Sequence, residues 1–201
     1  APGDVEGGQS VAKIEPYAAK DVYDPPIYSQ AVKVSGAQTI LYIAGQVAHT
    51  PEGGAAYPGD FKAQARAALQ CLKAQVEAGV QALQIFDSWA GALGRLDYRE
   101  FAMPHSARIF DELRDVGVPI IHFGVGTTAI LRDLAETGGD VVGVDWRLPL
   151  DEAWSIIGPN RAIQGNLDPT LLLGPRERLF AAAEDVLRRA AGRPGHIFNL
   201  G

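Results

Sequence analysis

The stretch Ala82-Leu83-Gln84-Ile85-Phe86-Asp87-Ser88-Trp89-Ala90-Gly91 decides how the rest of the sequence is interpreted. A short apolar run ends here at an acid, a hydroxyl and a large aromatic residue, and helical patterns follow further on. Such a run is typical of a β-strand that delivers polar side chains to the edge of a parallel sheet where α/β proteins bind ligands. Asp87 and Ser88 are therefore the first candidate site residues. A ligand site and a structural role are equally open for them.

The order of strand, polar edge and helix recurs from Gln81 to the last residue. Further strands are predicted at 119–123, 141–145, 162–164 and 196–198. Helices are predicted between them at 97–116, interrupted by Pro104, and at 128–137, 150–157 and 175–191. Strands and helices that alternate in this way predict an α/β fold with a parallel sheet and right-handed crossovers. About five strands are present, whereas a closed (β/α)8 barrel needs eight and typically ~250 residues.

The sequence before Gly79 has a different pattern. Residues 1–20 are predicted to be a flexible leader, because the first ten are small, acidic and Gly-rich and prolines follow. Strands are predicted at 31–34 and 39–44, and the short connection makes them an antiparallel hairpin. Asp60 is a good N-cap for an amphipathic helix that Gly79 can close. Residues 21–79 are thus expected to form a small α+β segment ahead of the repeat at 80–201.

Composition excludes several classes of protein. The chain has 201 residues, 47% of them hydrophobic and 21% charged, with a net charge of −6. The acidic balance argues against nucleic acid and against an anionic membrane surface as partners. A lone cysteine, Cys71, suits a reducing compartment, and no apolar run approaches a membrane span of ~20 residues. A cytoplasmic protein is expected.

Other polar residues at strand ends each have a structural alternative. Asp145 ends an apolar run, and it either binds a ligand or caps the next helix. Asn166 and Asp168 precede a proline and are sufficient to make a turn and an N-cap. The run 124–128 resembles a phosphate-binding loop only weakly. The four histidines show no metal-ligand spacing and no nucleophile motif, so no metal site is expected.

Residues 21–79 resemble the first half of a Rid (reactive intermediate deaminase, YjgF-type) protein. Three segments carry the resemblance: Tyr28-Ser29-Gln30, the run from Val34 to Ala48, and Gly59-Asp60-Phe61-Lys62-Ala63-Gln64-Ala65-Arg66. The resemblance implies hydrolysis of enamines or imines in a trimer. Tyr28 is the one pocket residue that it places, because the family's arginine and acid come from a second half that this sequence lacks.

Residues from about 74 to 201 resemble the C-terminal part of uroporphyrinogen decarboxylase. Four segments carry this resemblance: residues 84–91, Val141-Val142-Gly143-Val144-Asp145-Trp146, Gln164-Gly165-Asn166-Leu167-Asp168-Pro169 and Phe198-Asn199-Leu200-Gly201. The resemblance implies a (β/α)8 barrel, of which about five units are present. The helix ending at Gly79 fits either family. A natural fusion, a rearranged gene and a designed splice would all give this sequence.

The second resemblance implies a carboxy-lyase that converts the acetate side chains of uroporphyrinogen to methyl groups, without metal or organic cofactor. Ser88 matches the family's substrate-contacting hydroxyl, and Phe86 and Asp87 adjoin it. The family's arginine loop, pocket aspartate and active-site tyrosine belong to the part that is missing, and its histidine would follow Gly201. An incomplete enzyme with impaired turnover and tetrapyrrole binding in the haem pathway is therefore expected. The catalytic residues are not assigned.

Two alternatives from other classes stay open. One is a Rid-like enamine or imine deaminase. The other is a non-catalytic chimeric scaffold or tetrapyrrole-binding module, stabilised by its N-terminal hairpin and helix or by self-association into a homo-oligomer.

Overall fold

The computed structural model describes residues 13–17, 31–35, 40–43, 45, 47–50 and 52–201. The chain divides into two compact units, Ala1–Val80 and Gln81–Gly201. The boundary at 80/81 lies between the helix shared by both resemblances and the stretch that begins the strand and helix repeat. No helix in the described part of the chain combines the length and the apolar character that a membrane span requires.

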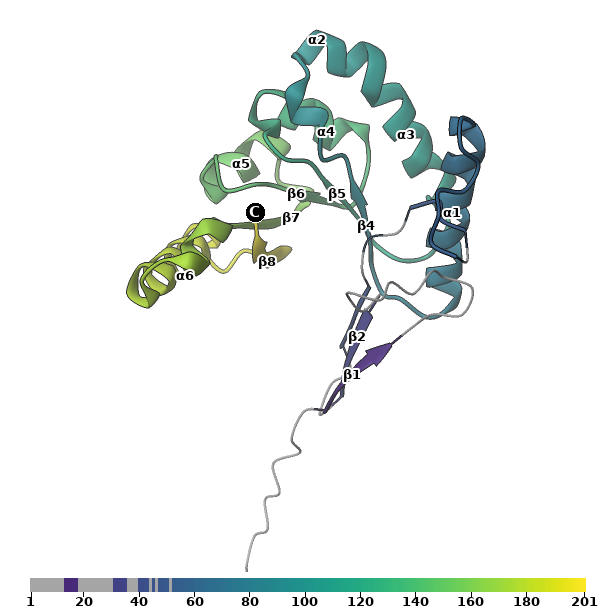
Figure 1. Cartoon of the computed structure of the whole chain (residues 1–201). Helices are drawn as coiled ribbons and strands as arrows, with labels where there is room; N and C mark the ends of the chain where they lie inside the picture. Colours follow the sequence, from purple (N-terminus) through teal and green to yellow (C-terminus); the bar gives the residue numbers. More distant parts are fainter. Residues whose placement is uncertain (1–12, 18–30, 36–39, 44, 46, 51) are drawn as a thin grey trace, which may run out of the picture. The chain divides into compact units, whose positions relative to one another are not determined.

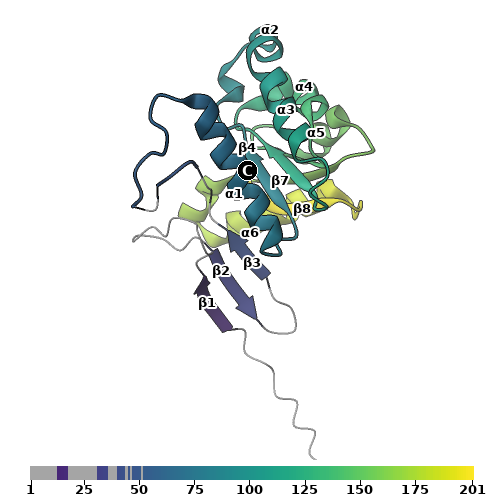
Figure 2. The same ribbon diagram turned by 90° about the vertical axis from the view of Figure 1, so that its right-hand side faces the viewer.

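The described residues of the N-terminal unit form a three-stranded antiparallel sheet and one helix. The strands are β1 (Lys13–Tyr17), β2 (Ala31–Ser35) and β3 (Ile40–Ile43), with β2 in the centre (Figure 2). The predicted hairpin is confirmed, because β2 pairs antiparallel with β3. Helix α1 (Phe61–Glu77) begins as predicted at Asp60, whose carboxylate accepts a hydrogen bond from the Ala63 amide at 3.0 Å.

Strand β1 differs from the sequence prediction. It lies at 13–17, inside the segment 1–20 that the sequence predicts to be a flexible leader. Pro16 occupies this strand opposite Val32. Proline is tolerated at the edge of a sheet, where its missing N–H needs no partner strand. The prolines that suggest an irregular chain are therefore compatible with an edge strand here.

The C-terminal unit is built on a five-stranded sheet. Its strands are β4 (Leu83–Phe86), β5 (Ile120–Phe123), β6 (Val141–Gly143), β7 (Ala162–Leu167) and β8 (His196–Leu200). They pair in chain order and all four pairings are parallel. The predicted α/β class and the five parallel strands are confirmed, and the arrangement is that of a partial (β/α)8 barrel.

Side chains on one face show that this sheet is strongly curved. The Gln164 side-chain amide on β7 donates a hydrogen bond to Gln84 Oε1 on β4 at 2.9 Å. Two strands lie between β4 and β7, so in a flat sheet they would be about 14 Å apart. The two glutamines can meet only because the sheet curls toward this face, as the wall of a barrel does.

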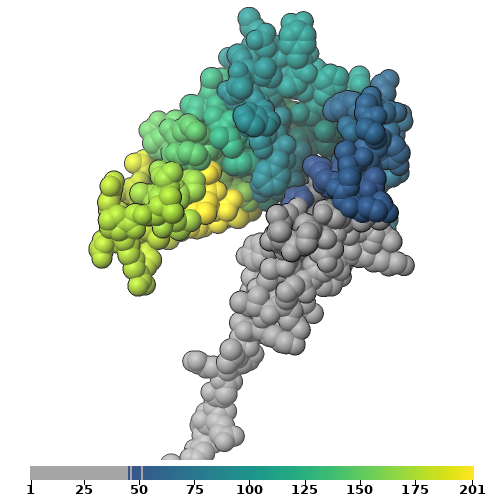
Figure 3. All heavy atoms as spheres, in the orientation of Figure 1, coloured from purple at the N-terminus to yellow at the C-terminus, as the bar shows by residue number. Residues whose placement is uncertain are grey.

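The helices of this unit follow the predicted order. They are α2 (Arg95–Asp97), the π-helical turn η2 (Tyr98–Ala102), α3 (Met103–Glu112), α4 (Leu131–Thr137), α5 (Leu150–Ile157) and α6 (Arg176–Ala190), with 3₁₀ segments η1 (Ala90–Ala92), η3 (Thr127–Ile130) and η4 (Pro169–Leu173). Helices α3, α4 and α5 lie on one side of the sheet (Figure 1), and α6 lies beside β8 at one end of the unit (Figure 3).

The helix predicted at 97–116 is divided into three pieces. Pro104 stands in the first turn of α3 and has no N–H to donate to a carbonyl four residues earlier. The chain reaches it through the π-helical turn η2. The N-terminal side of this helix also begins two residues earlier than predicted, at Arg95.

The core of the C-terminal unit lies between the sheet and the helices. Its largest fully buried side chains include Tyr98, Leu134, Leu150 and Ile163. A buried carboxylate, Asp133 on α4, is paired with the guanidinium groups of Arg95 and Arg99. The hydrogen bond from Arg95 is the main cause that holds the pKa of the Asp133 carboxyl below its usual value, against desolvation. Asp133 thus anchors the segment that follows the 87–91 turn.

Candidate functional site

The carboxyl ends of the five strands form one edge of the sheet, because all the strands are parallel. In register, Phe86 at the end of β4 is level with Phe123 on β5, and Phe123 is level with Gly143 on β6. Asp87, Asp145 and Asp168 therefore follow three strands at the same edge. In α/β proteins this is the edge that binds ligands.

The candidate residues Asp87 and Ser88 lie in a tight turn. The Asp87 amide donates to Phe123 O at 2.7 Å and the Ala90 amide donates to Asp87 O at 3.0 Å. The Phe86 ring packs edge-on against the Phe123 ring, with centroids 5.8 Å apart, yet Phe86 is 59% exposed. Ser88 is exposed at the top of the turn, and Trp89 beside it is 85% exposed. A hydroxyl and two aromatic surfaces are thus available to a ligand.

The Asp87 side chain turns away from solvent. Its Oδ2 accepts a hydrogen bond from Ser106 Oγ at 3.0 Å and lies 3.7 Å from His122 Nε2. The interaction with His122 is the largest cause that holds the pKa of the Asp87 carboxyl below its usual value, with Ser106 assisting and desolvation opposing. Asp87 is therefore a carboxylate at neutral pH and is engaged by the protein beneath the turn.

This trio of serine, histidine and aspartate is not a nucleophilic triad. A triad needs the hydroxyl hydrogen-bonded to the imidazole, whereas Ser106 donates to the carboxylate of Asp87. His122 is fully buried, so its ring has no access to a substrate. The described part of the chain also contains no cluster of three or more side chains able to hold a metal ion.

The carboxylate of Asp145 joins two strand-end loops. It accepts hydrogen bonds from the Gly126 amide at 2.5 Å and from the Arg147 amide at 3.0 Å, and it is paired with the Arg147 guanidinium. The Gly126 amide, in the run that weakly resembles a phosphate-binding loop, thus already has an acceptor. The same loop contacts the 87–91 turn that follows β4. The two backbones approach so closely that a Cβ added to Gly91 would stand 2.1 Å from Val125 O.

Asn166 and Asp168 are placed in structural roles at the end of β7. The buried Asn166 side-chain amide donates to Asp145 O at 3.0 Å and to Leu148 O at 2.6 Å. Asp168 caps η4, where its Oδ1 accepts from the Thr170 amide at 2.8 Å. Asp145 and Asn166 are therefore brought together, while Asp168 serves the next turn.

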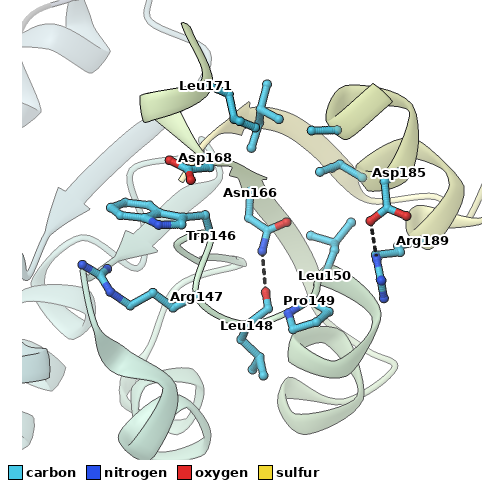
Figure 4. A pocket seen from close by; sticks show the side chains of 13 residues that line it. Trp146, Arg147, Leu148, Pro149, Leu150, Asn166, Asp168, Leu171, Asp185 and Arg189 are labelled. Atoms are coloured by element: carbon cyan, nitrogen blue, oxygen red, sulfur yellow. Dashed lines mark hydrogen bonds and ion pairs between the residues drawn. The ribbon is translucent and has the colours of Figure 1, made fainter. Parts of the chain in front are cut away.

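A pocket of about 330 Å³ opens beside this group, between the β6–α5 connection and α6 (Figure 4). Trp146 and Arg147 lie on one side of it, with the Arg147 guanidinium 4.3 Å from the centre of a Trp146 ring. Asp185 and Arg189 of α6 lie on the other side and are paired with each other. The pocket thus has aromatic and apolar walls and internally paired charges.

Sequence reasoning placed Asp87 and Ser88 at the edge but missed the partners of Asp87. His122 lies inside the apolar run Ile120–Phe123, and a histidine in a strand buried on both faces is the signal that a polar partner must be sought. Ser106 gives no such signal, since α3 reaches Asp87 only in the folded chain. Tyr28, the candidate of the Rid-like segment, lies outside the described residues.

Two family models match the sequence. One, described as uroporphyrinogen decarboxylase (URO-D), matches residues 61–201, and the other, described as endoribonuclease L-PSP, matches residues 24–85. Both resemblances drawn from the sequence are confirmed. The two matches overlap over residues 61–85, which contain α1, so this helix fits either family, as the sequence predicts.

Curated relatives cover the same C-terminal part. Uroporphyrinogen decarboxylase of Sorangium cellulosum is 51% identical over 151 residues, which are 75% of this chain and 42% of that protein. Those of Carboxydothermus hydrogenoformans and Rhodococcus erythropolis are 48% and 57% identical over 137 and 135 residues. These two matches cover 68% and 65% of this chain and 39% and 38% of the two relatives. The chain thus spans about two fifths of the length of these relatives.

Proposed function

The chain belongs to the uroporphyrinogen decarboxylase family, and from this premise we propose that it binds a uroporphyrinogen-type tetrapyrrole at the carboxyl-end edge of its parallel sheet. One observation carries the proposal: the family match includes all five strands, and the family-like serine, Ser88, is exposed at the end of β4. Phe86 and Trp89, exposed beside Ser88, offer apolar surface to a macrocycle.

The chemistry of the family sets what this edge has to supply. Loss of carbon dioxide from an acetate group leaves an electron pair, which a protonated pyrrole of the substrate itself accepts. The protein must bind the carboxylates, donate a proton and stabilise the cationic intermediate. Ser88 can donate a hydrogen bond, and the ionised Asp87 supplies negative charge beneath the turn.

The two arginines that line the pocket beside this edge are already paired within the protein. Arg147, which follows β6 directly, is already paired with Asp145, and Arg189 is paired with Asp151 and Asp185. Loss of one preorganised group of this kind commonly lowers the rate by ~10²–10³. The proposed function is therefore tetrapyrrole binding with decarboxylation far slower than in the longer relatives.

Replacing Ser88 by alanine is expected to weaken binding of uroporphyrin, the stable oxidised form of the substrate, by roughly 5- to 10-fold, because one hydrogen bond to a carboxylate is lost. The dissociation constant can be measured from the quenching of tryptophan fluorescence. Ser155→Ala is a matched control, since its hydroxyl donates to Glu152 O within α5. Equal affinities of the wild type and both variants would contradict the placement of the ligand at Ser88.

A second candidate function is favoured by the match over residues 24–85. Hydrolysis of an enamine or imine would then belong to the N-terminal unit, with Tyr28 as the candidate pocket residue. Release of ammonia from an unstable enamine, coupled to a dehydrogenase, tests it. A Tyr28→Phe variant with unchanged release would exclude that residue.

Partners and compartment follow from composition. A net charge of −6 supports a small-molecule partner in place of nucleic acid or a membrane surface. The single cysteine, Cys71, supports a reducing compartment such as the cytoplasm. Open edges at β4 and β8 in the described sheet favour association of the chain with a further copy or another polypeptide.

A further inference from the structure

His122 is a fully buried polar side chain that the proposed function does not use. It lies in the middle of β5 with no exposed surface, and its ring packs against the Phe110 ring of α3, with centroids 4.7 Å apart. Within the described part of the chain, neither of its ring nitrogens has a hydrogen-bond partner. A buried polar group without a partner is costly and calls for an explanation.

The charged side chain that lies near the His122 ring is Asp87. Nε2 of His122 and Oδ2 of Asp87 are 3.7 Å apart, within reach of electrostatic attraction but too far for a hydrogen bond. Only 24% of the Asp87 side chain is exposed, so the attraction is weakly screened by water. Ser106 Oγ donates to the same oxygen from α3. Ser106 of α3 and His122 of β5 therefore both interact with the same carboxylate oxygen.

Asp87 is also the residue on which the Ser88 turn is built. Its amide and carbonyl make the hydrogen bonds to Phe123 O and from Ala90 N that begin and close the turn. The contacts of its side chain with Ser106 and His122 therefore tie this turn to α3 and β5. Ser88 is the next residue, so a displacement of Asp87 also displaces the backbone of Ser88.

We propose that His122 is a positioning residue, which carries its hydrogen on Nε2, directs it at Asp87 Oδ2 and so fixes the turn that presents Ser88 to the ligand. His122 itself touches no ligand. The ligand-binding consequence rests on the proposed function, whereas the orientation of the ring and of the turn does not.

The hydrogen on Nε2 can be observed directly. In the 201-residue chain labelled with ¹⁵N, the imidazole correlations of His122 are expected to show a proton on Nε2, and Asp87→Asn is expected to move the Nε2 resonance. The assignment is overturned if the His122 ring carries its proton on Nδ1 alone. It is also overturned if the Nε2 resonance is the same in Asp87→Asn as in the wild type.

Substitutions then separate positioning from packing. In His122→Gln the amide nitrogen takes the place of Nε2. The Ser88 and Trp89 amide resonances should therefore stay at their wild-type positions, and the dissociation constant for uroporphyrin should stay within about twofold of the wild-type value. His122→Leu fills similar space but has no N–H to direct at Asp87, and we expect both amides to shift and binding to weaken about 5-fold, no more than in Ser88→Ala. If His122→Leu leaves both readouts at wild-type values, His122 is a packing residue and the proposal fails.

If His122→Leu does not fold, the Nε2 proton of the wild type still decides the proposal, and a variant on α3 tests the second contact to Asp87. Ser106→Ala removes the second contact to Asp87 Oδ2, and it should move the same two amides in the same direction. Ser155→Ala is the matched control, because its hydroxyl donates to Glu152 O within α5. If the wild type binds no uroporphyrin, the proposed function fails, while the amide shifts still decide the role of His122.

Discussion

Replacing Gly91 by alanine is expected to destabilise the C-terminal unit by about 3 kcal/mol or more. A Cβ at this position would stand 2.1 Å from Val125 O and 2.5 Å from the Gly126 carbonyl carbon. These are backbone atoms, so they cannot move aside as the end of a flexible side chain could. The 124–126 loop and the 87–91 turn would have to separate, and the midpoint of urea unfolding, followed by circular dichroism, should fall sharply.

Gly94 supplies the control for this substitution. A Cβ there would meet nothing nearer than Asp97 Oδ2, at 3.6 Å, which is ordinary contact. Gly94→Ala should therefore change the midpoint only slightly. Equal midpoints for the two variants would show that the contact between the turn and the loop is looser than the structure has it.

Replacing Asp145 by alanine should be nearly as damaging, at about 3 kcal/mol. The buried carboxylate satisfies the amides of Gly126 and Arg147, and both amides would lose their acceptor. The lost ion pair with Arg147 contributes less, because the Arg147 side chain is 48% exposed and is screened by water. The same unfolding measurement detects the loss.

Asp168→Ala tests whether the loss of stability expected for Asp145→Ala is specific to that position or common to acids that follow a strand. Asp168 also follows a strand and is also an acid, but it only caps η4, so its loss should cost about 1 kcal/mol. Asp145→Asn, which keeps an acceptor oxygen, should lie between the two. A smaller effect for Asp145→Ala than for Asp168→Ala would mean that Asp145 is not the tie between the loops, and would reopen it as a ligand-binding residue.

The architecture of the C-terminal unit was predictable because its local signals agree with the final fold. Each strand is an apolar run bounded by turn residues, and helix α5 has the predicted limits, 150–157. Such signals depend on near neighbours in the chain. The π-helical turn before Pro104 depends on how the helix continues without the N–H that proline lacks. The spacing of apolar residues does not reveal this.

The candidate site was predictable in place but not in detail. Asp87, Ser88, Asp145 and Asn166 could be assigned to strand ends from sequence, since parallel strands bring their carboxyl ends to one edge. Which of them faces solvent depends on contacts between distant segments. Asp87 is held by Ser106, 19 positions away, and Asp145 by Gly126, also 19 positions away. Sequence spacing does not encode either contact.

The proposed site of tetrapyrrole binding is the carboxyl-end edge of the sheet, over the turn that carries Ser88. An amide ¹H–¹⁵N titration of the 201-residue chain with uroporphyrin tests it most directly. We expect the resonances of residues 86–91 to move, with smaller changes at 124–126 and 145–147. Changes confined to the opposite edge, at the loops that precede the strands, or an unchanged spectrum would contradict it.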